Sequence, residues 1–250
     1  MKLLGAKLEY FSKSFLALLY PPHCFGCESP IENGHYVCEG CLDEIKRIVP
    51  PFCQLCCTPL ASEEIDLCRW CAHRKRYFDR ARSFGFYQDE EGVLERMIKA
   101  LKYNGEKALA KELARYLAQA VADMHEKFEK ITFVPQTRRK QRERGFNHAQ
   151  LIAQQLGELL HKETVQALVK IKETRPQVEL KGEERLQNLK NAFLANEPSC
   201  DNILLIDDVF TTGTTVDECS RALKRAGYKR VFVLTVARTK HKEEADAARD

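Results

Sequence analysis

The sequence lacks the features that mark a membrane-spanning, disordered or strongly charged protein. No run approaches the roughly 20 consecutive apolar residues that a membrane-spanning helix needs. Hydrophobic residues at 44% beside charged residues at 30% are an ordinary globular balance. The formal net charge is only +4, which is too small by itself to argue for a nucleic-acid partner. A chain of 250 residues is long enough for one large domain, or for a medium domain and a small one.

The first 20 residues have neither the uninterrupted apolar run of a membrane helix nor the small-residue cleavage site that follows a signal peptide. Apolar residues recur at helical spacing, but three lysines and a glutamate interrupt them. We expect an amphipathic helix over residues 1–20 that packs on the rest of the protein, with a membrane-surface or partner helix as the alternative. We also expect a cytoplasmic location, where thiols stay reduced and clustered cysteines bind metals in preference to forming disulfides.

Cysteine is abundant, and its distribution divides the chain. Nine of the eleven cysteines lie before residue 72. Eight of them form four Cys-x-x-Cys pairs: Cys24/Cys27, Cys38/Cys41, Cys53/Cys56 and Cys68/Cys71. Each pair is a tight turn that aims two thiolates at one point, so two turns complete a tetrahedral four-sulfur site that suits zinc.

The spacing of these pairs predicts two structural zinc ribbons within residues 21–76, paired in sequential order. Cross-braced pairing and iron–sulfur clusters are the alternatives. Because sulfur fills all four positions of each site, no position is open for catalysis. The segment holds six prolines and few large apolar residues, so we expect metal binding to supply its folding energy. Cys57, Cys200 and Cys219 fall outside the pairing and are expected to be spectators.

From residue 77 to residue 250, apolar runs alternate with amphipathic stretches, as in a parallel sheet covered by helices on both faces. We expect strands at 82–87, 131–134, 164–169, 203–206 and 230–236. We expect helices at 93–103, 108–128, 147–160, 183–193 and 214–226. The pattern predicts an α/β domain that follows the cysteine-rich one.

The most informative stretch begins where the apolar run 203–206 ends. Asp207 and Asp208 come next, followed by a loop rich in hydroxyl groups and the start of a helix. Ligands of open α/β sheets bind at this end of the strands, and loop amides at a helix start can hold a phosphate. The acidic pair is then expected to face hydroxyl groups or a metal ion. The alternative is a plain helix cap formed by Asp207 or Thr211.

This stretch resembles the phosphoribosyl pyrophosphate (PRPP) signature of type I phosphoribosyltransferases. The resemblance implies a parallel sheet flanked by helices, with a small hood over the site. It implies that Asp207 and Asp208 contact the ribose hydroxyls and that Mg²⁺ accompanies PRPP. It also implies that the 5′-phosphate binds the loop Thr211, Thr212, Gly213, Thr214 and Thr215. The Gly-Lys-Ser/Thr motif of a P-loop is absent.

A second stretch, residues 134–149, narrows the resemblance to ComF-type competence proteins. These proteins pair cysteine zinc ribbons with a phosphoribosyltransferase domain. Further matching positions are 19–22 before the first cysteine, 101–105, Thr174 with Gln177, and Arg185 with Asn188. Gln136 and Thr137 depart from the family pattern, because relatives often carry an apolar residue and a histidine there.

The segment 138–148 is strongly basic. Five cations, Arg138, Arg139, Lys140, Arg142 and Arg144, stand against Glu143, which gives +4 and equals the net charge of the whole chain. Arginine forks suit phosphate oxygens, so we expect an anion here, either pyrophosphate or a nucleic-acid backbone. Arg138, Arg142, Arg144 and Lys102 are the candidates for the pyrophosphate side. Arg138 and Arg144 join Asp207 and Asp208 as candidate catalytic residues.

Three functions remain open from the sequence. The first is a phosphoribosyltransferase whose acceptor is unknown, which includes an enzyme of nucleotide metabolism unrelated to DNA uptake. The second, implied by the ComF resemblance, is a protein of DNA uptake in natural transformation that handles single-stranded DNA and docks a helicase-like partner. The third is a PRPP-sensing regulator that has kept the fold and lost catalysis.

Overall fold

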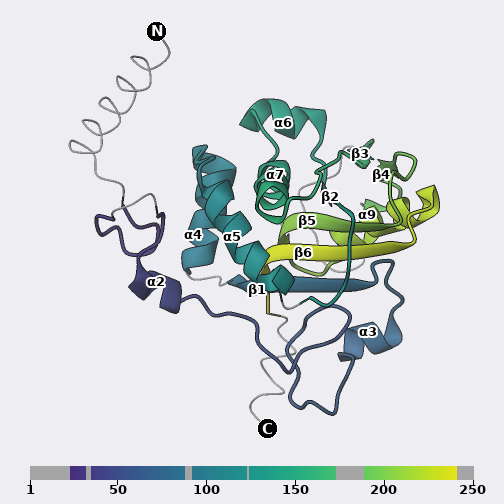
Figure 1. The fold of residues 1–250 in the computed structure, drawn as a ribbon, viewed down its shortest axis with the longest axis horizontal. Helices are drawn as coiled ribbons and strands as arrows, with labels where there is room; N and C mark the ends of the chain where they lie inside the picture. The colour runs from purple at the N-terminus through teal and green to yellow at the C-terminus, as the bar shows by residue number, and fades with distance from the viewer. Residues whose placement is uncertain (1–22, 32–34, 88–91, 123, 173–188, 241–250) are drawn as a thin grey trace.

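The computed structural model describes residues 23–31, 35–87, 92–122, 124–172 and 189–240. Four strands, β1 (Arg80–Tyr87), β2 (Lys130–Phe133), β5 (Asn202–Phe210) and β6 (Arg230–Thr239), form a sheet in the order β1-β6-β5-β2. All neighbours in this sheet are parallel (Figure 1). Two short antiparallel strands, β3 (Leu168–Lys170) and β4 (Phe193–Ala195), form a second sheet. The predicted parallel sheet is confirmed.

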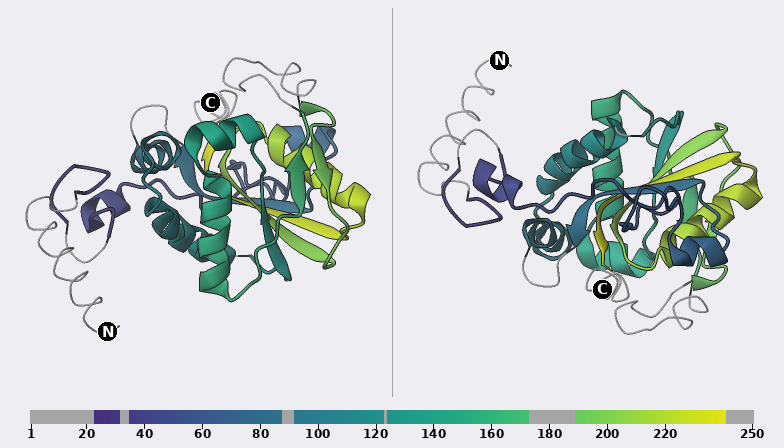
Figure 2. Two further views of the ribbon diagram at one scale, coloured as in Figure 1. Left: turned by 90° about the horizontal axis from the view of Figure 1, so that it is seen from above. Right: turned by 90° about the horizontal axis from the view of Figure 1, so that it is seen from below.

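Helices cover both faces of the main sheet (Figure 2). One face carries α4 (Val93–Lys99), the π-helix η1 (Ala100–Asn104), α5 (Leu109–Ala122) and α7 (His148–Leu160), and the other carries α9 (Thr214–Ala226). Strand β5 serves both faces, because side chains alternate along a strand. Leu204 and Ile206 belong to the first core, whereas Ile203 and Leu205 belong to the second.

Some predicted elements differ from the observed ones. The strand expected at 164–169 is reduced to a single bridge between Thr164 and Ile131, followed by β3. The helix expected at 108–128 is shorter, since α5 ends at Ala122. The helix expected at 183–193 is wrong at its end, because Phe193 begins β4 and pairs with Lys170.

The segment 138–148, treated as a loop from its charge, contains helix α6 (Arg138–Arg144). Thr137 begins this helix, since its hydroxyl accepts a hydrogen bond from the amide of Lys140. No residue of α6 is buried, so the sequence has no apolar periodicity that would signal a helix. The helix expected at 1–20 and the family positions at 19–22 and 174–188 lie outside the described residues.

The two cysteine-rich ribbons join the cores on different faces of the sheet. The first ribbon, with helix α2 (Glu39–Asp43), adds Cys24, Cys41 and Ile45 to the core under α4 and α5. The second ribbon, with helix α3 (Arg69–His73), adds its four paired cysteines to the core under α9. Figure 1 shows the first ribbon beside α4 and the second below β1. Each ribbon therefore shares a core that it cannot build by itself.

Two buried arginines from adjacent strands fasten the second ribbon to the sheet. Arg238 of β6 is fully buried and donates hydrogen bonds to the Cys56 carbonyl (2.8 Å) and to the Thr58 hydroxyl (2.8 Å). Arg82 of β1 donates to the Gln54 carbonyl (3.2 Å). Four thiolates around Zn²⁺ would together carry net negative charge, which these two cations would offset.

Among the described residues, no helix combines the length and the apolar composition that crossing a bilayer requires.

We expect Arg238→Met to lower the free energy of unfolding by about 2–4 kcal/mol, because a buried carbonyl and a buried hydroxyl lose their donor. Urea unfolding measures the change. The control is Arg230→Met, which removes an exposed arginine from the other end of β6 and should change stability by less than about 0.5 kcal/mol. Equal stability of the two variants would show that Arg238 does not fasten the ribbon.

Candidate functional site

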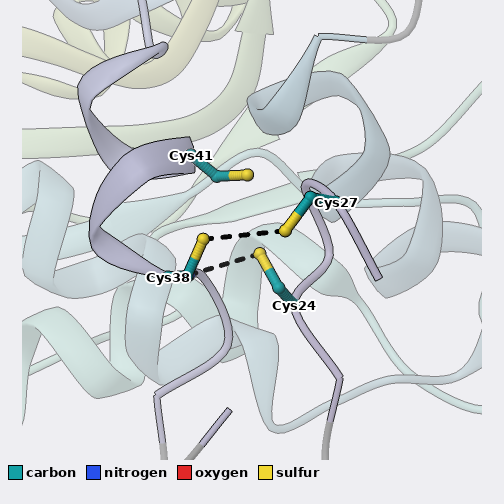
Figure 3. A group of neighbouring side chains, drawn as sticks. All are labelled: Cys24, Cys27, Cys38 and Cys41. Carbon is teal, nitrogen blue, oxygen red and sulfur yellow. Dashed lines mark hydrogen bonds between the residues drawn. The ribbon is translucent and has the colours of Figure 1, made fainter. Parts of the chain in front are cut away.

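The eight paired cysteines form two separate four-sulfur groups. One group is Cys24, Cys27, Cys38 and Cys41, and the other is Cys53, Cys56, Cys68 and Cys71. Within each group the ligand atoms all lie within 4.8 Å of one another, and Figure 3 shows the sulfur atoms of the first group directed at a common centre. The structure therefore has the sequential pairing and not the cross-braced one.

The spacing of these sulfur atoms fits zinc. The Sγ atoms of Cys27 and Cys38 are 3.7 Å apart, and those of Cys56 and Cys68 are 3.6 Å apart. A tetrahedral site with zinc–sulfur bonds of about 2.3 Å places its sulfur atoms about 3.8 Å apart. The zinc expected here is structural, since each group already supplies four thiolates.

The first group also needs a cation to ionise fully. Backbone amides of Gly26 and Cys38 donate to the Cys24 sulfur at 3.2 Å. Hydrogen bonds with Ser29 lower the pKa of Cys27 to about 6, whereas burial and the neighbouring thiols raise the pKa of Cys41. Without a metal, Cys27 and Cys41 thus differ in protonation. A zinc ion stabilises all four as thiolates.

The three remaining cysteines lie outside the metal groups found among the described residues. Cys57 is buried beside Cys56 with a left-handed backbone (φ 64°), and burial raises the pKa of its thiol. Cys219 is buried on α9, and Cys200 is half-buried before β5. Their positions agree with a spectator role.

A second site lies at the carboxyl edge of the parallel sheet. Asp207 and Asp208 are in the last part of β5, and both are largely buried. Lys102 of η1 makes an ion pair with Asp208, and the Nε2 atom of His148, the first residue of α7, lies 3.1 Å from the same carboxylate oxygen. These residues meet at the carboxyl end of the sheet, because the segments that connect each parallel strand to the next helix lie at that end.

The two adjacent carboxyl groups have opposite protonation preferences. Burial, together with the charge of Asp208, raises the pKa of Asp207 to about 8. Burial also acts to raise the pKa of Asp208, but Lys102 and His148 outweigh it and hold this pKa well below its ordinary value. At neutral pH, Asp208 is therefore an anion and Asp207 a neutral acid that can both donate and accept a hydrogen bond.

His148 is held neutral and in one tautomer. Burial lowers the pKa of His148, against the opposing charge of Asp208. The Nδ1 atom lies 2.6 Å from the side-chain amide nitrogen of Gln136, which can only donate, so Nδ1 accepts and Nε2 carries the proton toward Asp208. Gln136, a departure from the family pattern, thus sets the orientation of the histidine that contacts the acidic pair.

The loop after Asp208 ends in a glycine turn that starts a helix. Gly213 adopts a left-handed backbone (φ 73°), and a Cβ atom there would lie 2.4 Å from the Phe210 ring, so only glycine fits. Helix α9 begins after Gly213 without a side-chain cap. The alternative that Asp207 or Thr211 is a plain cap is therefore wrong. The hydroxyls of Thr212 and Thr214 lie 2.8 Å apart, beside amides at the positive end of the helix.

The basic residues of α6 point in two directions. Arg144 points toward His148, since its Nη1 atom is 3.4 Å from His148 Nδ1 and its guanidinium lies over the Tyr103 ring. Lys140 is half-buried, whereas Arg138, Arg139 and Arg142 are exposed. Of the four pyrophosphate candidates, the structure brings Lys102 to Asp208 and Arg144 to His148, and it leaves Arg138 and Arg142 exposed on α6.

Two residues of this site, His148 and Gln136, were not among the sequence-predicted site residues. The signal was Asn147, whose side chain caps α7 by accepting from the amides of Ala149 and Gln150. The same side chain donates to the Val134 carbonyl at the end of β2. An N-cap that bridges to a neighbouring strand end places the next residue, His148, at the carboxyl edge of the sheet.

Comparison with known families and proteins agrees with this two-part organisation. The double zinc ribbon domain family matches residues 15–72, and the phosphoribosyl transferase domain family matches residues 102–250. Competence protein F of Haemophilus influenzae is 34% identical over 226 residues, which cover 86% of this chain and 95% of that protein.

Two further relatives have similar lengths. DNA utilization protein YhgH of Salmonella typhimurium is 30% identical over 230 residues, covering 89% of this chain and 99% of that protein. Competence protein ComFC of Bacillus subtilis is 26% identical over 198 residues, covering 76% and 79%. The similarity extends over both the cysteine-rich part and the sheet.

We expect native mass spectrometry of the protein to detect zinc in both four-sulfur groups. Cys38→Ser should remove the zinc of the first group and leave that of the second, because three thiolates hold the ion less tightly. The controls Cys57→Ser and Cys200→Ser should retain both ions. A loss of zinc in either control would contradict the assignment of these cysteines as spectators.

Proposed function

The chain belongs to the ComF-type family, in which a double zinc ribbon precedes a phosphoribosyl transferase domain. On this premise, we propose that the chain binds PRPP at the carboxyl end of the sheet, where Asp207 and Asp208 lie. The sugar lies over the carboxyl groups, and its 5′-phosphate lies in the loop from Thr211 to Thr215. The pyrophosphate lies on the side of Lys102 and Arg144.

The observation that carries this proposal is the pair of adjacent buried carboxyl groups in β5, followed by a loop and an uncapped helix start. Each ribose hydroxyl both donates and accepts. An ionised Asp208 accepts from one hydroxyl, and a neutral Asp207 exchanges both kinds of hydrogen bond with the other. The loop that follows these carboxyl groups along the chain, residues 211–215, can then hold the phosphate with its backbone amides at the start of α9.

Charge at the site suits the departure of pyrophosphate. Lys102 and Arg144 already lie beside Asp208 and His148, and Lys140 is half-buried on the same helix as Arg144. The phosphates of PRPP, together with one or two carboxylates, would hold Mg²⁺, which would supply further positive charge toward the pyrophosphate. In a transfer reaction, the bond from ribose C1 to pyrophosphate breaks, and the acceptor forms a new bond to C1. The protein contributes positioning and charge stabilisation of the leaving group.

Isothermal titration with PRPP and Mg²⁺ tests this proposal. We expect binding to the wild type and at least about tenfold weaker binding to Asp207→Asn/Asp208→Asn, since hydrogen bonds to a charged group contribute about 1.5–3 kcal/mol. The control Asp201→Asn, an exposed aspartate at the start of β5, should bind like the wild type. Absence of heat with the wild type, or equal affinity of the acidic-pair variant, overturns the proposal.

Turnover distinguishes an enzyme from a sensor that uses the same site. A phosphoribosyltransferase releases pyrophosphate in the presence of its acceptor, whereas a PRPP-sensing regulator binds PRPP and releases none. A pyrophosphate-release assay across nucleobases, amines and single-stranded DNA therefore separates these two functions. An acceptor among free bases would favour nucleotide metabolism over DNA uptake.

A second candidate function, binding of single-stranded DNA, rests on the exposed face of α6. Arg138, Arg139 and Arg142 are exposed there, and Tyr103, 68% exposed, lies under the Arg144 guanidinium. Cations that follow a backbone, with an aromatic ring on which a base can stack, suit single-stranded DNA. The printed names of the relatives, Competence protein F and DNA utilization protein, support a role in DNA uptake. Docking of a helicase-like partner belongs to the same proposal.

Gel shifts with a single-stranded oligonucleotide across a salt series test this candidate. We expect Arg138→Gln/Arg139→Gln/Arg142→Gln to weaken binding on the order of tenfold at low salt and to flatten the salt dependence, because fewer counterions are released. The control Lys127→Gln/Arg225→Gln/Lys229→Gln removes three exposed cations near the amino ends of strands β2 and β6. Equal affinity of the two triple variants would exclude α6 as the DNA contact.

A further inference from the structure

A buried arginine connects the second zinc ribbon to the phosphate loop. Arg76 follows Cys71, the last cysteine of that ribbon, and its side chain is only 5% exposed. Its Nη2 atom donates to the carbonyl oxygen of Thr212 at 3.4 Å, and its Nη1 atom lies 3.9 Å from Asp217 Oδ2. The Nε and Nη1 atoms have no hydrogen-bond partner among the described residues.

The chain on either side of Arg76 is fixed to helix α9 and to the loop. The amide of Tyr77 donates to Asp217 Oδ1 at 2.7 Å, in the first turn of α9. The Arg76 guanidinium lies over the Phe78 ring, and Phe78 packs edge-on against Phe210, with ring centres 6.1 Å apart. Phe210 in turn fills the space beside Gly213. A continuous packed contact therefore runs from the ribbon to the glycine turn that starts α9.

A guanidinium this deeply buried is costly unless its donors are used. The Thr212 carbonyl accepts from it at 3.4 Å and the Asp217 carboxylate lies 3.9 Å away, so its positive charge is compensated only in part. A carbonyl held toward Arg76 also leaves the peptide units that follow it free to turn their N–H groups to the opposite, ligand side. Both consequences favour an anion in the loop.

We propose that Arg76 is a positioning residue for the phosphate loop, so that the second zinc ribbon forms part of the site for a sugar 5-phosphate. The identity of the ligand rests on the proposed function. The contact between Arg76 and the loop does not. Arg76 holds the Thr212 carbonyl on the ribbon side and adds positive charge behind the loop, while the amides from Gly213 onward contact the phosphate.

The ligands that test this proposal differ in which phosphate they carry. PRPP and ribose 5-phosphate both have the 5′-phosphate, whereas inorganic pyrophosphate lacks it. Isothermal titration of the full chain with each ligand is compared for the wild type, Arg76→Gln and the control Lys75→Gln, which removes the exposed neighbouring cation. We expect Arg76→Gln to weaken PRPP and ribose 5-phosphate by the same factor, on the order of tenfold, with pyrophosphate unchanged and Lys75→Gln like the wild type.

A merely structural role of Arg76 gives a different result. It would lower the melting temperature and weaken all three ligands together, or leave all three affinities unchanged, and either outcome overturns the proposal. Amide hydrogen exchange of residues 211–216 in the ligand-free protein provides a readout that needs no ligand. We expect faster exchange confined to this loop in Arg76→Gln and not in Lys75→Gln.

The exchange measurement also separates this proposal from the proposed function. If the wild type binds none of the three ligands but the loop exchanges faster in Arg76→Gln, PRPP binding is wrong and the positioning by Arg76 stands. If loop exchange is unchanged in Arg76→Gln, the positioning by Arg76 is wrong whatever the wild type binds.

Discussion

The rest of the structure depends on the burial of β5 between two cores. Its apolar side chains alternate between the core under α4 and α5 and the core under α9, so the strand cannot shift its register by one residue without losing both contacts. This constraint continues into Asp207 and Asp208, which lie in the last part of the strand as neighbouring buried carboxyl groups. Their separation in pKa follows from that burial, because two adjacent carboxylates in a desolvated place do not both ionise.

Buried charge is compensated in the same way at two places, the acidic pair of β5 and the second ribbon. Lys102 and a neutral, oriented His148 stabilise the Asp208 anion at the carboxyl edge. Arg82 and Arg238 donate to the backbone of the second ribbon, next to four sulfurs that, as thiolates around Zn²⁺, would together carry net negative charge. In each case, cations of the sheet domain face fixed anions. The ribbon is thus held by charge and hydrogen bonds as well as by the shared core.

The sequence predicts those parts of the fold that carry a local pattern. Helix α9 was predicted at its observed bounds, Thr214–Ala226, because its start follows a turn glycine and its apolar stripe is regular. Helix α6 was not predicted, since no apolar residue of it is buried. His148 was not predicted as a site residue, because its position beside Asp208 arises from the contact of α7 with β5, two segments distant in the sequence. Spacing within a segment reveals ligands such as the paired cysteines, whereas partners from separate elements become visible only in the fold.

The shared cores have a consequence for how the two parts of the chain act. A ribbon attached by a free linker would bind its zinc without affecting the edge of the sheet. Here the second ribbon contributes to the core under α9, its backbone accepts from Arg238 of β6, and the chain that leaves it contacts Thr212 and Asp217. Zinc binding to the second ribbon would therefore order the surface against which the loop 211–215 packs. If the proposed ligand binds that loop, metal binding and ligand binding would stabilise the same arrangement, and each would favour the state in which the other occurs.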